Sequence, residues 1–184
     1  SGLQYTYHNA KNAETFGIEL DMKKSLDFIG LRGLSLVCNA AYIHSRVRFE
    51  EGAPERDRPL AGQSPYLVNA GLFYQHDDKG ISASLLYNRI GKRIESVGVP
   101  MQNQNEDIPD IYEMPRNSLD LTFSKKIGKV VEIKAGIQDM LNSKIEYKQF
   151  VKLADENGGK REREQLVRSY RPGVDINVGV SLKF

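Results

Sequence analysis

The sequence contains few residues of several types and no long apolar run, and two of these shortages argue against a class of protein. Of 184 residues, one is cysteine, three are histidine and none is tryptophan. A single cysteine, Cys38, excludes an intrachain disulfide framework and a zinc site built from several cysteines. No apolar run approaches the roughly 20 residues that a membrane-spanning helix needs. Neither a disulfide-stapled domain nor a spanning helix is therefore expected in this sequence.

Charge is nearly balanced, which bears on the partners of the chain. The 26 basic and 24 acidic residues give a formal net charge of +2 and are mixed along the sequence. Because no basic stripe stands out, we expect no nucleic-acid partner. The mean hydropathy of −0.49 is typical of a soluble protein. Strands of a membrane barrel alternate apolar and polar residues, however, so averaging hides them and a barrel remains possible.

The last segment, residues 174–184, has the clearest pattern. Val174, Ile176, Val178, Val180 and Leu182 alternate with polar or small residues up to the terminal Phe184. A period of two places every apolar side chain on one face of a strand. At about 3.3 Å per residue the strand is roughly 35 Å long, which is enough to cross a bilayer when tilted.

The same alternation recurs upstream and predicts six further strands. Residues 4–8 add the possible end of an eighth. The six predicted strands cover residues 16–23, 34–43, 66–75, 81–88, 118–124 and 131–138.

The connections between these strands alternate strictly between short and long. Short turns are expected at residues 24–33, 77–80 and 126–129. Long polar loops are expected at residues 50–64, 91–116 and 143–165. An up-and-down barrel with tight turns on one rim and extended loops on the other produces this order, whereas a Greek-key sandwich does not.

The pattern therefore predicts an all-β fold, an antiparallel up-and-down transmembrane β-barrel forming one domain over residues 1–184. The apolar parity contains no charged residue, as a lipid-facing surface requires. The polar parity includes charged residues that would face the lumen of such a barrel. These lumen-facing residues are Glu19, Asp21, Asp120 and Lys134.

Four short motifs carry a resemblance to a known family. Residues 12–20 (NAETFGIEL) are similar to a strand entry in which Asn and small residues lead into G-V-E. Residues 60–69 fit L-x-G-x-x-P, residues 87–94 fit Y-x-x-x-G-x-R, and residues 138–142 (QDMLN) are similar to Q-D-L-L-N. In this order, and with a terminal Phe184 of the kind that barrel-assembly machinery reads, the chain resembles the end of a TonB-dependent outer-membrane receptor of the Bacteroidetes type.

The resemblance implies a location in the cell outer membrane and a role in nutrient import. The family's barrel has about 22 strands around a plug. The chain would then be its last third, with the plug and the TonB-contacting segment lying N-terminal to it. The resemblance also implies periplasmic short turns, extracellular long loops and a siderophore, haem, cobalamin or glycan as ligand. We expect no enzymatic activity, cofactor or resident metal.

Candidate ligand-binding residues lie in the long loops. Glu106, Asp107 and Asp110 either chelate a cation through carboxylate oxygens or form a solvated acidic loop. Arg168 and Arg171 either meet an anionic ligand, such as lipopolysaccharide phosphate, or are ordinary rim charges. No catalytic residue is expected.

Two other classes stay open at this point. One is an independent eight-stranded outer-membrane barrel with a structural or lipid-modifying role. No hydrolytic triad is evident for it, because the adjacent His44 and Ser45 would point to opposite faces of a strand. The other is a soluble lipocalin-like barrel, in which the apolar parity would face inward.

Overall fold

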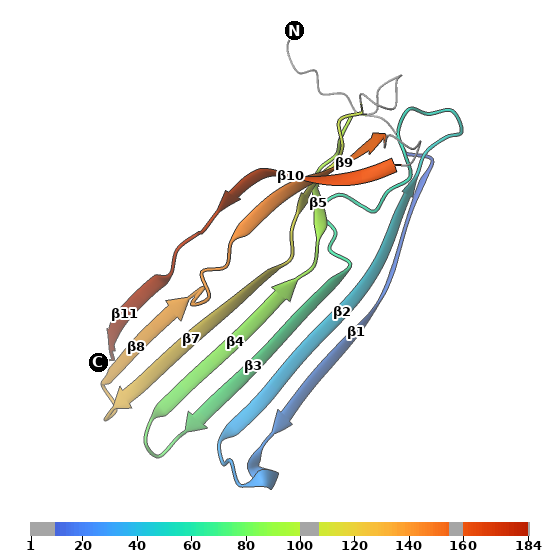
Figure 1. Ribbon diagram of the computed structural model, residues 1–184. Coiled ribbons are helices and arrows are strands. Elements are labelled where there is room, and N and C mark those ends of the chain that lie inside the picture. The colour runs from blue at the N-terminus through green and yellow to red at the C-terminus, as the bar shows by residue number, and fades with distance from the viewer. Residues whose placement is uncertain (1–9, 100–106, 155–159, 184) are drawn as a thin grey trace.

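The main structural unit is one antiparallel sheet. The computed structural model describes residues 10–99, 107–154 and 160–183. Seven strands pair in the order β1-β2-β3-β4-β7-β8-β11 (Figure 1). Their bounds are β1 (Asn12–Ser25), β2 (Leu34–Arg48), β3 (Tyr66–His76), β4 (Ile81–Ile90), β7 (Arg116–Ile127), β8 (Val131–Gln138) and β11 (Asp175–Leu182). All seven predicted strands are confirmed, whereas the possible strand end at residues 4–8 lies outside the described residues.

Short turns join these strands at one end of the sheet, here named the short-turn end. The first contains a 3-10 helix, η1 (Asp27–Ile29), between β1 and β2. The other two connect β3 to β4 and β7 to β8, and contain Gly80 (φ 59°) and Gly128 (φ 60°). Glycine adopts this left-handed conformation without the steric cost that a Cβ atom brings. The short-turn expectation is confirmed.

Three long loops were expected between the strands. The second and third of these segments contain strands, so the expectation is wrong for both. Residues 91–116 contain β5 (Arg93–Ser96) and β6 (Ile111–Glu113), and residues 143–165 contain β9 (Ile145–Ala154) and most of β10 (Lys160–Tyr170). These four strands form a second sheet in the order β10-β9-β6-β5. This order repeats β11-β8-β7-β4, because each strand of the second sheet continues a strand of the main sheet. The second sheet is thus an extension at the end opposite the short turns, the long-loop end.

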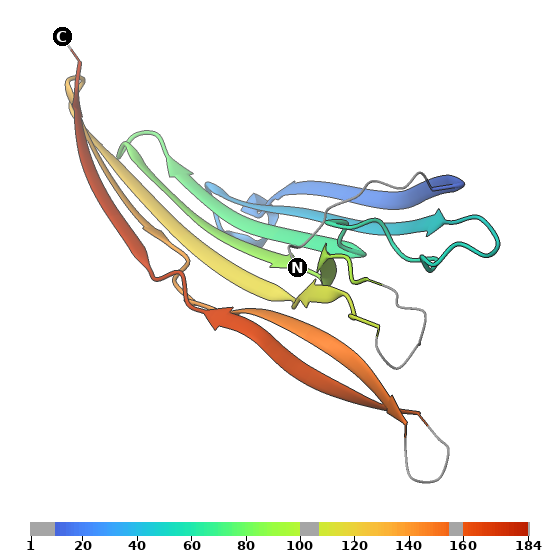
Figure 2. The ribbon, with the colours of Figure 1, turned by 90° about the horizontal axis from the view of Figure 1, so that it is seen from above.

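The described part of the chain does not close into a barrel. The outer strands of the main sheet are β1 and β11, each of which pairs with a single neighbour. Figure 2 shows the sheet as an open, curved surface with these two strands at opposite sides. What the structure establishes is an antiparallel all-β protein. No helix in the described ranges is long and apolar enough to cross a membrane.

The main sheet has no hydrophobic core on either side. The chain exposes 13,710 Å², whereas a compact protein of this mass exposes about 9,000 Å². In the described residues, the buried apolar side chains are Val47, Ile94, Ile145 and Tyr147, all toward the long-loop end. No described element covers the seven-stranded sheet, so both of its faces are available to surroundings outside this chain.

Candidate functional site

One face of the main sheet is apolar across all seven strands. The register aligns Met22, Cys38, Ala70, Tyr87 and Leu119 in a single row across five neighbouring strands. The side chains are most exposed at the edges, where Ile18 is 78% and Val178 is 72% exposed. This apolar face consists of Phe16, Ile18, Leu20, Met22, Leu36, Cys38, Ala40, Val68, Ala70, Leu72, Ala83, Leu85, Leu119, Leu121, Phe123, Ile133, Ala135, Ile137, Ile176, Val178, Val180 and Leu182. Cys38 is the one member with an ionisable group, and ionisable side chains border these members on the same side of the sheet. His44 and Arg89 pair with Phe16 and Val68 toward the long-loop end, and Lys24 and Lys125 pair with Leu36 and Ile133 toward the short-turn end.

Tyrosines border the apolar face along β3. Tyr66 lies at its long-loop end with Tyr42 level with it, and Tyr74 lies near its short-turn end, whereas Tyr87 is level with Ala70, midway between Tyr66 and Tyr74. The eight residue steps from Tyr66 to Tyr74 span about 27 Å along the strand. A strand tilt of about 40° reduces this to roughly 20 Å, and the tyrosine rings at both ends add to it. The apolar height is thus of the same order as the band of about 25 Å on outer-membrane barrels.

A hydrogen-bonded cluster supports the tyrosines at the long-loop end. The Arg89 Nε donates to the Tyr66 hydroxyl at 3.3 Å, and its Nη1 donates to the Asn117 Oδ1 at 2.8 Å. The Tyr87 hydroxyl donates to the same Asn117 oxygen at 2.8 Å. Arg89 therefore ends the apolar face with a positive charge that tyrosine hydroxyls and an amide hold in place. The sequence analysis did not single out this cluster, because its members lie on three strands.

The opposite face of the main sheet, the polar face, has a row of amides and carboxylates. The Asn39 Nδ2 donates to the Glu19 Oε1 and to the Asp21 Oδ1, each at 2.7 Å. The Asn69 Nδ2 donates to the Asn39 Oδ1 at 3.3 Å, and the Asn88 Nδ2 donates to the Asn69 Oδ1. The row crosses four strands and satisfies polar groups on a surface that has no apolar cover.

An apolar pair interrupts this polar face. Phe73 and Leu86 are 39% and 38% exposed and belong to it by strand alternation. Both lie against Gly71, where an added Cβ would come within 2.7 Å of the Leu86 Cδ2 and 2.8 Å of the Phe73 Cε2. The missing side chain of Gly71 leaves the space that the two larger side chains occupy. Glycine in the middle of a predicted strand was the available signal for such a close approach.

All four residues predicted to face the lumen lie on the polar face. Glu19 and Asp21 accept hydrogen bonds from Asn39, as described above. Asp120 accepts a hydrogen bond from the Asp139 backbone N–H at 2.7 Å. The Lys134 Nζ lies 3.4 Å from the Glu132 Oε2. The structure thus places these charges on one side of the sheet, distributed from β1 to β8.

The acidic residues of the middle loop are engaged within the chain. Asp107 forms an ion pair with Arg56. Asp110 accepts a hydrogen bond from the Gly98 backbone N–H at 2.7 Å and one from the Tyr112 hydroxyl at 3.4 Å. Within the described residues, no three His, Cys, Asp or Glu side chains are grouped to hold a metal ion. Glu106 and Phe184 lie outside the described residues.

Arg168 and Arg171 lie close in sequence but occupy different settings. The Arg168 guanidinium lies 4.1 Å from the centre of the Tyr147 ring and 5.8 Å from that of Tyr170. Burial raises the pKa of the Tyr147 hydroxyl, with a further contribution from the nearby Glu113 carboxylate. Arg171 instead donates to the backbone oxygen of Asn142, where the chain passes between β10 and β11.

The second sheet brings together a lysine and two aromatic rings that the sequence analysis treated as loop residues. The Lys92 Nζ lies 4.5 Å from the centres of both the Tyr112 and the Phe150 rings. The two rings meet edge to face at 5.7 Å. Burial is the main cause that raises the pKa of the Tyr112 hydroxyl. Cation–π contacts of this kind contribute about 0.5–1 kcal/mol at exposed sites.

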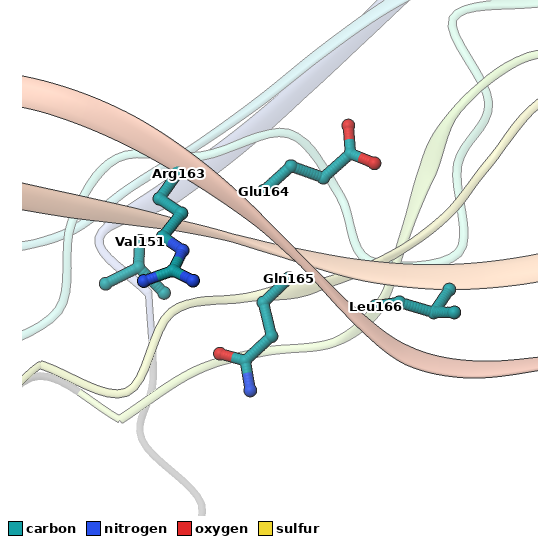
Figure 3. A pocket seen from close by; sticks show the side chains of 5 residues that line it. All are labelled: Val151, Arg163, Glu164, Gln165 and Leu166. Carbon is teal, nitrogen blue, oxygen red and sulfur yellow. The ribbon is translucent and has the colours of Figure 1, made fainter.

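A hollow of about 510 Å³ lies on the β9–β10 hairpin. Val151, Arg163, Glu164, Gln165 and Leu166 line it, as Figure 3 shows. Arg163 and Gln165 extend from one side of the twisted ribbon, and Glu164 extends from the other. Because both sides of one hairpin contribute, this is an open surface of the ribbon and not an enclosed ligand cavity.

Comparison with known proteins found no relative of this chain. No protein-family model matches this chain, and no curated protein or solved structure matches it. Its class therefore rests on the fold and on the two faces of its main sheet. It is an antiparallel all-β protein with one uncovered apolar face and one hydrogen-bonded polar face.

Proposed function

We propose that this chain is part of the barrel wall of a TonB-dependent outer-membrane receptor. The apolar face contacts lipid hydrocarbon, and the polar face lines the lumen and contacts the plug. The observation that carries the proposal is an exposed apolar surface, seven strands wide, with tyrosines at its ends and charged side chains confined to its margins. Soluble monomers rarely leave contiguous apolar patches above a few hundred Å² in water.

The positions of the family-like motifs support the proposal. The Gly91 backbone N–H, in the Y-x-x-x-G-x-R segment, donates to the Ser64 Oγ at 2.9 Å. In the same region the Gly62 backbone N–H donates to the Ile94 oxygen at 2.8 Å. Two motifs far apart in sequence thus meet where β4 leaves the main sheet and β5 begins. The shared role of these segments is to fasten the long-loop end of the wall.

In this proposal the two ends of the sheet lie on opposite sides of the membrane. The short turns face the periplasm, and the second sheet extends the wall into the external medium. There it helps capture a siderophore, haem, cobalamin or glycan, which the parent protein imports without covalent chemistry. The uncovered edges of β1 and β11 would pair with further strands of the same barrel, since unpaired edges promote aggregation. These open edges favour the receptor over a closed lipocalin-like barrel.

Two adjacent leucines on opposite faces of β4 allow a test of which face contacts lipid. Leu85 belongs to the apolar face and Leu86 to the polar face, and their exposures are 36% and 38%. An arginine facing lipid near the midplane costs about 2–4 kcal/mol, and a lumen-facing arginine costs little. In the full-length protein, Leu85→Arg should reduce the folded barrel in the outer membrane far more than Leu86→Arg.

The amount of folded protein in isolated outer membranes is the measurement, with Leu72→Arg and Phe73→Arg as a second pair on β3. Leu72 lies on the apolar face and Phe73 on the polar face, at 37% and 39% exposure. Equal losses within both pairs, or greater losses from Leu86→Arg and Phe73→Arg, would refute the lipid-facing assignment.

A further inference from the structure

The basic and acidic side chains of strand β10 lie on opposite sides of the strand. Arg161 and Arg163 alternate with Glu162 and Glu164, so regular strand geometry places the arginines on one side and the glutamates on the other. Figure 3 shows Arg163 and Glu164 extending to opposite sides of the ribbon.

A β-bulge keeps a third arginine on the arginine side. Leu166 pairs with Lys148, and Arg168 pairs with Tyr147, so Val167 between them has no partner in the ladder. Without the bulge, regular alternation along the strand would place Arg168 on the side of Glu162 and Glu164. The bulge instead aligns it with Arg161 and Arg163, as bulges commonly re-aim side chains. We name Arg161, Arg163 and Arg168 the arginine face.

In the described part of the chain, none of the three arginines forms an ion pair, and Glu113, which lies on their side of the second sheet, is paired with Arg93. The ion pair that β10 forms there is on the other side, where the Glu164 Oε1 lies 2.6 Å from the Lys148 Nζ. That hydrogen bond is the main cause that raises the pKa of Lys148. Arg168 instead packs over Tyr147 and Tyr170, which orient its guanidinium without cancelling its charge.

The arginine face lies on the same side of the chain as the apolar face. Strand alternation continues from Tyr87 and Arg89 to Arg93, and the second sheet then pairs Arg93 with Glu113, Glu113 with Tyr147, and Tyr147 with Arg168. Gly91, between β4 and β5, lies on the side of the apolar face, because a Cβ at this position would come within 2.8 Å of the Tyr66 ring. Along the strands, the outer surface therefore runs from apolar side chains through tyrosines to the arginine face.

We propose that the arginine face binds the phosphate groups of lipid headgroups in the outer leaflet. This inference rests on the proposed function, since it needs the apolar face to contact lipid. A surface that is apolar, then aromatic, then cationic matches a membrane that is hydrocarbon, then interface, then anionic headgroup. The planar guanidinium fork binds phosphate oxygens in pairs, a geometry that lysine does not offer.

The test uses the full-length protein in phosphatidylcholine nanodiscs that contain a small fraction of fluorescent diphosphoryl lipid A. The triple variant Arg161→Gln, Arg163→Gln, Arg168→Gln removes the charges. A contribution of roughly fivefold per arginine near a membrane surface predicts a loss of lipid A affinity on the order of 100-fold. The matched control, Glu162→Gln with Glu164→Gln, changes the opposite side and should leave the affinity within about twofold or increase it slightly.

Three further results show whether the lipid phosphate itself is what the arginines bind. Replacing the three arginines by lysine should restore part of the affinity, and dephosphorylated lipid A should bind the native protein as weakly as diphosphoryl lipid A binds the glutamine variant. Undiminished binding by the glutamine variant overturns the inference, as does displacement of lipid A by millimolar inorganic phosphate. Far-UV circular dichroism checks folding of each variant. If the leucine pairs behave as predicted while these tests fail, the inference falls and the proposed function stands.

Discussion

The Arg116 Nη2 and the Asp139 Oδ2 lie 2.5 Å apart at the point where β8 leaves the main sheet. Asp139 has a left-handed backbone with φ 52°, which is uncommon for a residue with a Cβ atom. Its backbone N–H donates to the Asp120 carboxylate, so the ion pair and this hydrogen bond together hold the break between β8 and β9. Charged groups thus fix the point where a strand of the main sheet continues into the second sheet.

Removing the arginine of this pair should destabilise the long-loop end. Arg116→Ala leaves a largely buried carboxylate without its counter-ion, at a cost of about 2 kcal/mol. Lys11→Ala is the control, because the Lys11 Nζ and the Glu50 Oε2 are 3.6 Å apart and well exposed. An exposed pair of that kind contributes about 0–1 kcal/mol. The unfolding midpoint in detergent measures both, and equal losses would contradict the assigned role of Arg116.

Two glycines of the first short turn should differ in their response to alanine. Gly30 and Gly33 have φ values of 86° and 75°, so each substitution carries the left-handed cost of about 1–2 kcal/mol. A Cβ at Gly30 meets nothing within 4 Å, whereas at Gly33 it would come within 2.2 Å of the Gln75 backbone oxygen. Gly33→Ala should therefore cost about 1–3 kcal/mol more, as overpacking does. Similar unfolding midpoints for the two variants would contradict this prediction, because the backbones at Gly33 and Gln75 would then move apart at little cost.

Acid should loosen the same turn through Asp27. Its pKa is lowered from 3.8, first by the Ser25 hydroxyl at 2.6 Å and then by the Gly33 backbone N–H at 2.9 Å. Because the folded state favours the charged form, the stabilisation is full above pH 3.8 and is lost as the pH falls through the lower folded pKa. The amide resonance of Gly33 should titrate with a midpoint below 3.8 and lose that titration in Asp27→Asn. A midpoint at or above 3.8 contradicts this account.

The sequence predicted the main sheet because its strands obey one simple rule. Residues 174–184 alternate almost without exception, and the structure pairs β11 with β8 in a continuous register from Asp175 to Leu182. Where one side of a strand is apolar and the other polar, a period of two defines both the strand and its faces. Glu19 and Lys134 were assigned to the correct common face for this reason.

The sequence analysis did not predict the second sheet, because its strands have charged residues on both sides. The segment from Lys160 to Gln165 contains lysine, arginines and glutamates and resembles a solvated loop. Its alternation is in the sign of the charge and not in polarity, which a hydropathy pattern does not detect. The bulge at Val167 and the contacts of Arg89 with Tyr66 and Asn117 depend on neighbouring strands, and no local pattern specifies them.

The environment of successive side chains on β3 tests the central claim most directly. Single spin labels at positions 67–73 of the full-length protein in lipid bilayers report collision with oxygen, which concentrates in hydrocarbon, and with a water-soluble nickel chelate. The account predicts that oxygen accessibility peaks at Val68, Ala70 and Leu72, and that nickel accessibility is relatively higher at Leu67, Asn69, Gly71 and Phe73. Oxygen maxima at the odd positions, or the absence of any period of two, would contradict it.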